Sequence, residues 1–260
     1  MKKEKQPLNH YHRFLDEAGD MTFYGKGRVP ILGEQGVIQC FILGMVKFHT
    51  DILPIRKKLF EMQNSIPVNP YYENVPSVVK RVKKGGFYFH AKDDLPELRK
   101  EFFDFIKTLD CSFYAVVARK NYGIFERKHH GKSNEMYVDL LSHLLIEEFN
   151  TDEKLILNIA ELDSSTHAQN LEKAVEMARG IGQTKKVTCN TWKFKDDPLL
   201  SIADYMCWTV QRIFETEETR FYNYMKNKIG KIWDIYDKEG QVYVQGNPLT
   251  EKNKVGSQLP

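Results

Sequence analysis

The chain has 260 residues, of which 42% are hydrophobic and 28% are charged, and its net charge is +3. These totals describe an ordinary soluble globular protein that can bury a full core in one large domain. The net charge is too small to identify a nucleic-acid binder, so only local clusters of basic residues could do so.

The cysteines and the N-terminus predict a cytoplasmic protein. No Cys-x-x-Cys pair occurs, and the cysteines lie in apolar runs, which is typical of reduced, buried thiols. The four cysteines are Cys40, Cys111, Cys189 and Cys207. The first residues lack the apolar core of a signal peptide. No run approaches the ~18 apolar residues of a membrane span, so we expect no membrane partner.

Two strands and a helix are predicted first. Residues 11–15 and the nearly continuous apolar run 37–48 predict an antiparallel pair of strands. A helix is predicted over 51–62, with Thr50 or Asp51 as its cap. Residues 63–86 lose this periodicity, contain three prolines and end in a basic run, so we expect an insertion or mobile loop there.

Strands and helices then alternate along the chain. Further strands are predicted at residues 87–90, 111–118, 155–162 and 187–194, and further helices at 95–109, 133–149, 166–181 and 199–214. Asp93 or Asp94 is the expected cap of the helix at 95–109. The pattern predicts a single α/β domain, with a mixed sheet flanked by helices and a polar tail over about 238–260.

Acidic residues follow the first predicted strand directly. Asp16 and Glu17 are adjacent, Gly19 supplies the freedom for a turn, and Asp20 adds a third acid. Acids are rare inside strands, and strand ends hold side chains in fixed directions. We therefore interpret these acids as candidate ligands for a hard cation, with an acidic turn that caps a hairpin as the alternative.

Two further acids lie in comparable places. Asp163 ends the predicted strand 155–162, where ligand crevices form in α/β sheets, although it could equally cap the next helix. Asp204 lies at the edge of the apolar stripe of helix 199–214, and no Lys or Arg is one turn away to pair with it. A bound cation would provide that partner; a solvated boundary position is the alternative.

Together, Asp16, Asp163 and Asp204 form the set of carboxylates that a divalent-metal nuclease needs. Mg²⁺ binds carboxylates, waters and phosphate oxygens. Two such ions about 4 Å apart can activate a water and stabilise the leaving oxygen. Without a cation the clustered acids would repel one another and raise a pKa.

His90 and two basic runs are further candidates. His90 could move protons near a phosphodiester, or it could be a hydrogen-bonded structural residue. The basic runs at 80–84 and 127–132 could hold a nucleic-acid backbone, or they could be solvated loops. The residues predicted to bind nucleic acid are Lys83, Lys84, Arg127 and Lys128.

Three short motifs occur in order along residues 11–215. They are Asp16-Glu17-Ala18-Gly19-Asp20, Phe89-His90-Ala91 and Ile202-Ala203-Asp204. They resemble motifs of domain-of-unknown-function family 3800, which usually has Ser where this chain has Ala18. That family looks like a branch of the ribonuclease-H-like superfamily. The resemblance implies a mixed five-stranded sheet flanked by helices, with Asp16, Asp163 and Asp204 as ligands of Mg²⁺ or Mn²⁺ and Glu17 as a less certain ligand.

The leading hypothesis is a metal-dependent nuclease or phosphodiesterase of ribonuclease-H-like fold. Its catalytic residues would be Asp16, Glu17, His90, Asp163 and Asp204. The rival hypothesis is a module of the same fold that binds nucleic acid or protein without turnover, in a mobile-element or defence system. A small-molecule hydrolase is a third possibility, but no Gly-x-Ser-x-Gly elbow occurs.

Overall fold

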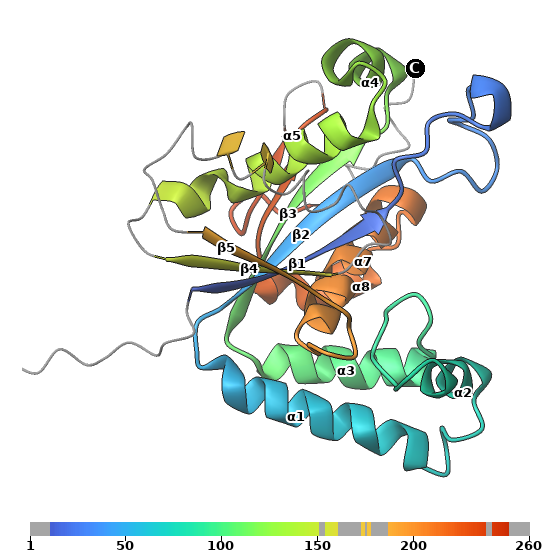
Figure 1. Cartoon of the computed structure of the whole chain (residues 1–260), viewed down its shortest axis with the longest axis vertical. Coiled ribbons are helices and arrows are strands. Elements are labelled where there is room, and N and C mark those ends of the chain that lie inside the picture. The colour runs from blue at the N-terminus through green and yellow to red at the C-terminus, as the bar shows by residue number, and fades with distance from the viewer. Residues whose placement is uncertain are drawn as a thin grey trace, which may run out of the picture.

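One mixed sheet organises the chain (Figure 1). The structure is a computed structural model, which describes residues 11–150, 154–160, 173–174, 176–177, 187–237 and 241–249. Within these ranges the sheet has seven strands in the order β5-β4-β1-β2-β3-β6-β7. The strands are β1 (His12–Gly19), β2 (Cys40–Phe48), β3 (Cys111–Arg119), β4 (Leu155–Ala160), β5 (Val187–Trp192), β6 (Ile229–Asp234) and β7 (Val242–Tyr243).

The sheet combines antiparallel and parallel pairing. β1 pairs antiparallel with β2, and β2 pairs antiparallel with β3. On the other side of β1, β4 and β5 both run parallel to it. β6 runs parallel to β3, and β7 is antiparallel to β6 at the edge. These pairings confirm the predicted α/β class and mixed sheet, but the described sheet has seven strands where the resemblance implied five.

Helices cover both faces of the sheet (Figure 1). They are α1 (Ile52–Ser65), α2 (Pro76–Lys83), α3 (Pro96–Thr108), α4 (Tyr122–His129), α5 (Ser133–Leu145), α7 (Leu200–Thr216) and α8 (Arg220–Met225). α7 packs across β1 and β2 and shares its hydrophobic core with α1 and α3. α5 packs on the opposite face, over β2 and β3. No helix in the described ranges has the length and apolar composition needed to span a bilayer.

Side chains of β1 alternate between these two cores. Phe14 belongs to the core beneath α7, and Leu15 belongs to the core beneath α5. Because strand residues two apart share a face, Asp16 lies on the α7 side and Glu17 on the α5 side. The two adjacent acids are therefore directed to opposite faces of the sheet.

The strongly periodic elements agree with the predictions to within a few residues. For example, α1 begins after Asp51, whose carboxylate accepts a hydrogen bond from the Leu53 N–H at 3.0 Å. The main differences lie in residues 63–90. α2 forms where we expected an insertion or mobile loop, and residues 87–90 belong to no strand. α4, α8, β6 and β7 were not predicted, and most of the helix expected at 166–181 lies outside the described residues.

Candidate active site

Asp16 and Asp204 meet where α7 crosses β1, although they are far apart in the sequence. The Cys207 thiol, one turn after Asp204, donates a hydrogen bond to the Asp16 carbonyl oxygen at 3.3 Å. Gly44 lies opposite Asp16 on β2, and a Cβ atom there would come within 2.4 Å of the Cys207 sulfur. The absence of a side chain at Gly44 therefore lets α7 approach the sheet closely enough to bring the two carboxylates together.

The two carboxylates are buried and repel each other. Asp16 is 8% exposed and Asp204 is 7% exposed. Burial, followed by repulsion from Asp204, raises the pKa of Asp16 well above its usual value. Burial also raises the pKa of Asp204 to about 6, although the nearby His90 ring and the Ala91 N–H oppose this shift. No Lys or Arg of the described chain forms an ion pair with either acid, so a cation would stabilise the pair.

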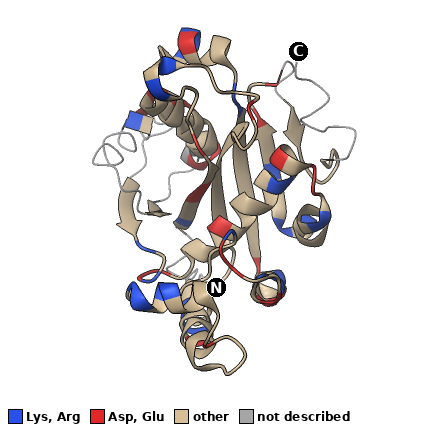
Figure 2. Cartoon of the chain, turned by 90° about the vertical axis from the view of Figure 1, so that its right-hand side faces the viewer, with Lys and Arg blue, Asp and Glu red and all other residues tan. Residues whose placement is uncertain are grey.

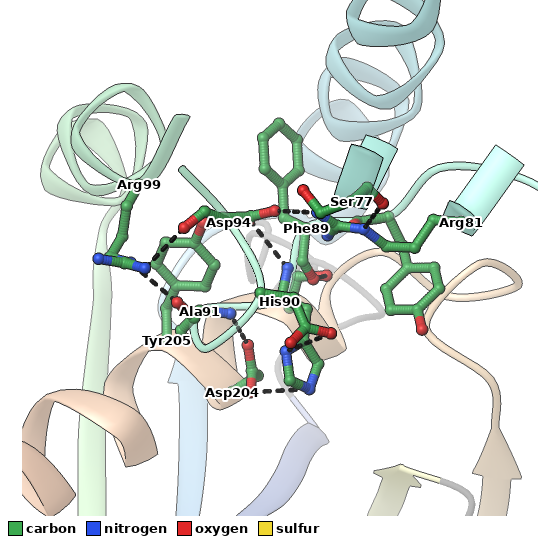
Figure 3. A network of polar contacts seen from close by, with 12 residues as sticks. Ser77, Arg81, Phe89, His90, Ala91, Asp94, Arg99, Asp204 and Tyr205 are labelled. Atoms are coloured by element: carbon green, nitrogen blue, oxygen red, sulfur yellow. Dashed lines mark hydrogen bonds and ion pairs between the residues drawn. The ribbon is translucent and has the colours of Figure 1, made fainter. Parts of the chain in front are cut away.

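A turn before α3 brings His90 to Asp204 (Figure 3). The Ala91 N–H donates a hydrogen bond to Asp204 Oδ2 at 2.6 Å, and His90 Nε2 lies 4.0 Å from Asp204 Oδ1. The other ring nitrogen, Nδ1, has no hydrogen-bond partner within the described ranges and lies 3.8 Å from Asp93 Oδ2. His90 therefore has a suitable position for carrying a proton beside the carboxylates.

Asp94 holds the turn from inside. Its carboxylate forms an ion pair with Arg81 of α2 at 2.7 Å, and it accepts hydrogen bonds from the His90 N–H and the Tyr205 hydroxyl. Neither Asp93 nor Asp94 caps α3, whose N-cap is Leu95 without a side-chain hydrogen bond. The capping prediction was wrong because the Asp94 side chain is directed inward to the buried Arg81 guanidinium.

Two further contacts fix the same turn from the helices around it. Arg99 of α3 donates hydrogen bonds to the carbonyl oxygens of Ala91 at 2.8 Å and Asp94 at 2.6 Å. Ser201 of α7 donates a hydrogen bond to the Phe89 carbonyl oxygen at 2.8 Å. The turn is therefore attached to α2, α3 and α7, and the backbone donor that holds Asp204 is fixed in place (Figure 3).

Glu17 and Asp20 do not join the pair. Glu17 lies on the α5 side, where it borders a cavity of about 10 Å³ with Leu43 and Tyr137 among the lining residues. Burial raises the pKa of Glu17 to about 7. Asp20 forms an ion pair with Lys120 at 2.7 Å. Glu17 thus has a different environment from Asp16, and the charge of Asp20 is already compensated.

Asp163 lies outside the described residues, so its part in the site stays a prediction. β4 ends at Ala160, whose side chain belongs to the core beneath α7, the side of the sheet on which Asp16 lies. Among the described residues, no group of three His, Cys, Asp or Glu side chains could hold a metal ion together. A metal site built on Asp16 and Asp204 therefore needs at least one more ligand, and Asp163 is the candidate that the sequence supplies.

The four basic residues predicted to bind nucleic acid do not form one surface. Lys83 and Lys84 lie at the end of α2, whereas Arg127 and Lys128 lie in α4, at the other end of the molecule (Figure 1). Lys128 forms an ion pair with Asp139 at 2.8 Å. Basic and acidic residues are interspersed over the fold in Figure 2. Only the α2 pair belongs to an element that contacts the turn bearing His90.

Comparison with known proteins gives no relative. The sequence matches no protein-family model, and no curated protein is similar to it. The resemblance to domain-of-unknown-function family 3800 therefore stays a prediction that depends on three short motifs.

Sequence reasoning missed Arg81 and Phe194, two residues that shape the surroundings of His90. Arg81 was counted as part of a basic run, yet it is 4% exposed and supports the turn through Asp94. Phe194 lies in the stretch predicted as an edge strand, and its ring packs against His90 with the centroids 6.0 Å apart. The one signal in the sequence was an aromatic residue among polar neighbours, two residues before Asp196.

Proposed function

We propose that the protein is a metal-dependent phosphodiester hydrolase that acts on nucleic acid and has a ribonuclease-H-like fold. The pair of Asp16 and Asp204 carries this proposal, because two buried, mutually repelling carboxylates are costly unless a cation binds them. The antiparallel run β1-β2-β3, followed by β4 and β5 parallel to β1, supports the proposed fold.

The residues present suit Mg²⁺ or Mn²⁺, which prefer carboxylate oxygens together with water and phosphate oxygens. Asp16 and Asp204 would hold the ion, with Asp163 as the proposed third ligand. When bound, such an ion supplies a Lewis acid and lowers the pKa of water. The Ala91 N–H occupies Asp204 Oδ2, so Oδ1, on the His90 side, is the oxygen free to serve as a ligand.

His90 would act as a general acid or base in the reaction. Its ring lies beside Asp204 and is 28% exposed, so it is open to water as well as to the carboxylates. From this position it can take a proton from the attacking water or give one to the leaving oxygen.

Cleavage assays test the proposal. Labelled single- and double-stranded DNA and RNA would be incubated with the purified protein in Mg²⁺, in Mn²⁺ and in EDTA. We expect metal-dependent cleavage that Asp16→Asn and Asp204→Asn each reduce by about 100-fold or more. The matched control is Asp110→Asn, which neutralises an exposed acid outside the site. Equal cleavage by all variants, or no cleavage of any substrate, would reject the proposal and favour a binding module without turnover.

A further inference from the structure

A group of aromatic rings borders the candidate active site. Tyr88 and Phe194 stack with their centroids 5.7 Å apart and their planes inclined by 15°. The His90 ring meets Phe194 edge-on at 6.0 Å. We call Tyr88, His90 and Phe194 the aromatic ledge. Because His90 also lies 4.0 Å from Asp204, the ledge leads directly to the carboxylate pair.

The segment that carries Phe194 is held in place by buried contacts. The N–H groups of Asp196 and Asp197 donate hydrogen bonds to the Lys193 carbonyl oxygen, which closes a turn. The buried Asp197 carboxylate forms an ion pair with Arg56 of α1 at 2.9 Å and accepts a hydrogen bond from the Leu199 N–H. The ledge is therefore attached to α1 and to the start of α7, so a ligand need not order it on binding.

The segments that carry the ledge, and the end of α2 beside them, are rich in exposed basic side chains. Lys195 Nζ lies 3.2 Å from the position that a Cβ atom would take at Gly85, so the ledge segment meets the end of α2 there. Trp192, at the end of β5, adds an aromatic side chain that is 40% exposed. The exposed basic residues on these segments are Lys80, Lys83, Lys84, Lys92, Lys193 and Lys195, and the exposed acids are Asp93 and Asp196. This excess of positive charge is complementary to a phosphate backbone.

We propose that the aromatic ledge and its flanking lysines bind single-stranded nucleic acid and lead one of its phosphodiesters to Asp16 and Asp204. One base would stack on Phe194, while Lys84 and Lys195 contact neighbouring phosphates. A single strand fits better than a duplex, because bases in a duplex are already stacked on one another and have no free face for a protein ring. This inference rests on the proposed function for the identity of the reacting bond, but the binding itself needs no metal.

Fluorescence anisotropy on the full chain in EDTA tests the inference. The probes are a fluorescein-labelled DNA strand and an RNA strand, each about 20 nucleotides long and of one sequence, together with the corresponding DNA duplex. Both single strands should bind more tightly than the duplex, and their relative affinities show whether DNA or RNA is preferred. Phe194→Ala should weaken single-strand binding about tenfold. Lys195→Ala should reduce the slope of log K against log salt by about 0.7, the contribution of one phosphate contact.

Matched controls separate stacking from folding. Phe194→Leu keeps an apolar side chain against Tyr88 but lacks a π face, so it should bind as weakly as Phe194→Ala while unfolding at the temperature of the wild type. Tyr71→Ala changes a tyrosine that is 67% exposed and lies outside the ledge, and it should bind normally. Lys58→Ala is the corresponding control for charge on α1, where the exposed Lys58 forms an ion pair with Glu61 of the same helix.

The possible outcomes distinguish this inference from the proposed function. A duplex that binds as tightly as the single strands, or a Phe194→Leu variant with wild-type affinity, would overturn the inference even if the enzyme cleaves nucleic acid. If binding depends on Phe194 and Lys195 but the protein cleaves no substrate, the strand-binding inference is supported and the proposed hydrolase function is rejected.

Discussion

The packing at Gly44 leaves no room for a side chain, and the close approach of Asp16 and Asp204 depends on the absence of one there. A Cβ atom would come within 2.4 Å of Cys207 Sγ and 2.5 Å of the Phe113 ring. Both neighbours are buried side chains of the core beneath α7. Gly44, which has no side chain, thus allows Asp204 to lie next to Asp16.

Gly44→Ala should destabilise the protein by about 1–3 kcal/mol, because α7 must move outward or Phe113 must leave its rotamer. Urea unfolding followed by circular dichroism measures this loss. The control is Gly246→Ala, where a new Cβ atom would have no neighbour within 4 Å. If the two variants unfold at the same urea concentration, close packing at Gly44 does not position α7.

Asp204→Asn should have opposite effects on the metal-free and metal-bound protein. The amide still accepts the Ala91 hydrogen bond but no longer repels Asp16, so at pH 8 in EDTA the variant should be at least as stable as the wild type. Millimolar Mg²⁺ or Mn²⁺ should raise the melting temperature of the wild type and leave that of the variant unchanged. A variant that is destabilised in EDTA, or still stabilised by the ions, would contradict a cation site on this acid.

Among the structural elements, the turn before α3 is the one that assembles the site. α2, α3 and α7 each hold it by a side chain, and the buried ion pair of Arg81 and Asp94 is the most enclosed of these contacts. The two side chains are 5% and 0% exposed, so water cannot solvate either charge if its partner is removed. The turn is therefore sensitive to a single charge change.

Arg81→Met should cost about 3–5 kcal/mol, because it leaves the Asp94 carboxylate buried without its cation. The same variant should lower cleavage, since the turn carries His90 and the Ala91 N–H. Lys58→Met is the surface comparison, because both members of the Lys58–Glu61 pair are more than half exposed, and it should cost less than about 1 kcal/mol. Chemical unfolding of both variants measures the loss of unfolding free energy. Equal losses would mean that the buried ion pair contributes no more to stability than the exposed one.

The elements that the sequence predicts well are those whose burial follows a simple period. β2 is apolar nearly throughout and lies inside the sheet. Asp51 is the N-cap of α1, as its place before the helix indicates. α2 was missed because its buried face contains Arg81, whose partner Asp94 lies outside the helix, in the turn before α3, so the periodicity of α2 does not reveal it. The Ala91 N–H that holds Asp204 could not be predicted either, because a backbone donor has no sequence signature. The burial of Asp204 agrees with its place beside an apolar stripe, whereas its role as a metal ligand stays a prediction.

Over the whole molecule, several buried acids should make stability fall as pH rises. Burial raises the pKa of Asp234 to about 6 from its usual 3.8, although Arg119 opposes the shift at 2.6 Å. The folded protein holds this proton more tightly than the unfolded chain, so ionisation of Asp234 destabilises the fold. This loss of stability is absent below about pH 4 and complete above about pH 6. A shift of this size corresponds to about 3 kcal/mol.

The wild type should therefore unfold at higher denaturant concentration at pH 5 than at pH 8, and Asp234→Asn should reduce that difference. The variant also loses the charge partner of Arg119, so the informative quantity is the pH dependence and not the stability at one pH. Asp110→Asn, at an exposed acid, should leave the difference intact. An unfolding free energy that increases from pH 5 to pH 8 in the wild type would show that these acids do not control stability.

The two acids of the carboxylate pair come from the first strand and from α7, which follows β1 to β5 in the chain. During synthesis, Asp16 leaves the ribosome long before Asp204 has been translated. A growing polypeptide can therefore pair β1 with β2 early, but it cannot assemble the pair until α7 has emerged and docked. Contacts so distant along the chain also close slowly. An unfinished or prematurely terminated product would thus lack the paired carboxylates on which the proposed activity depends.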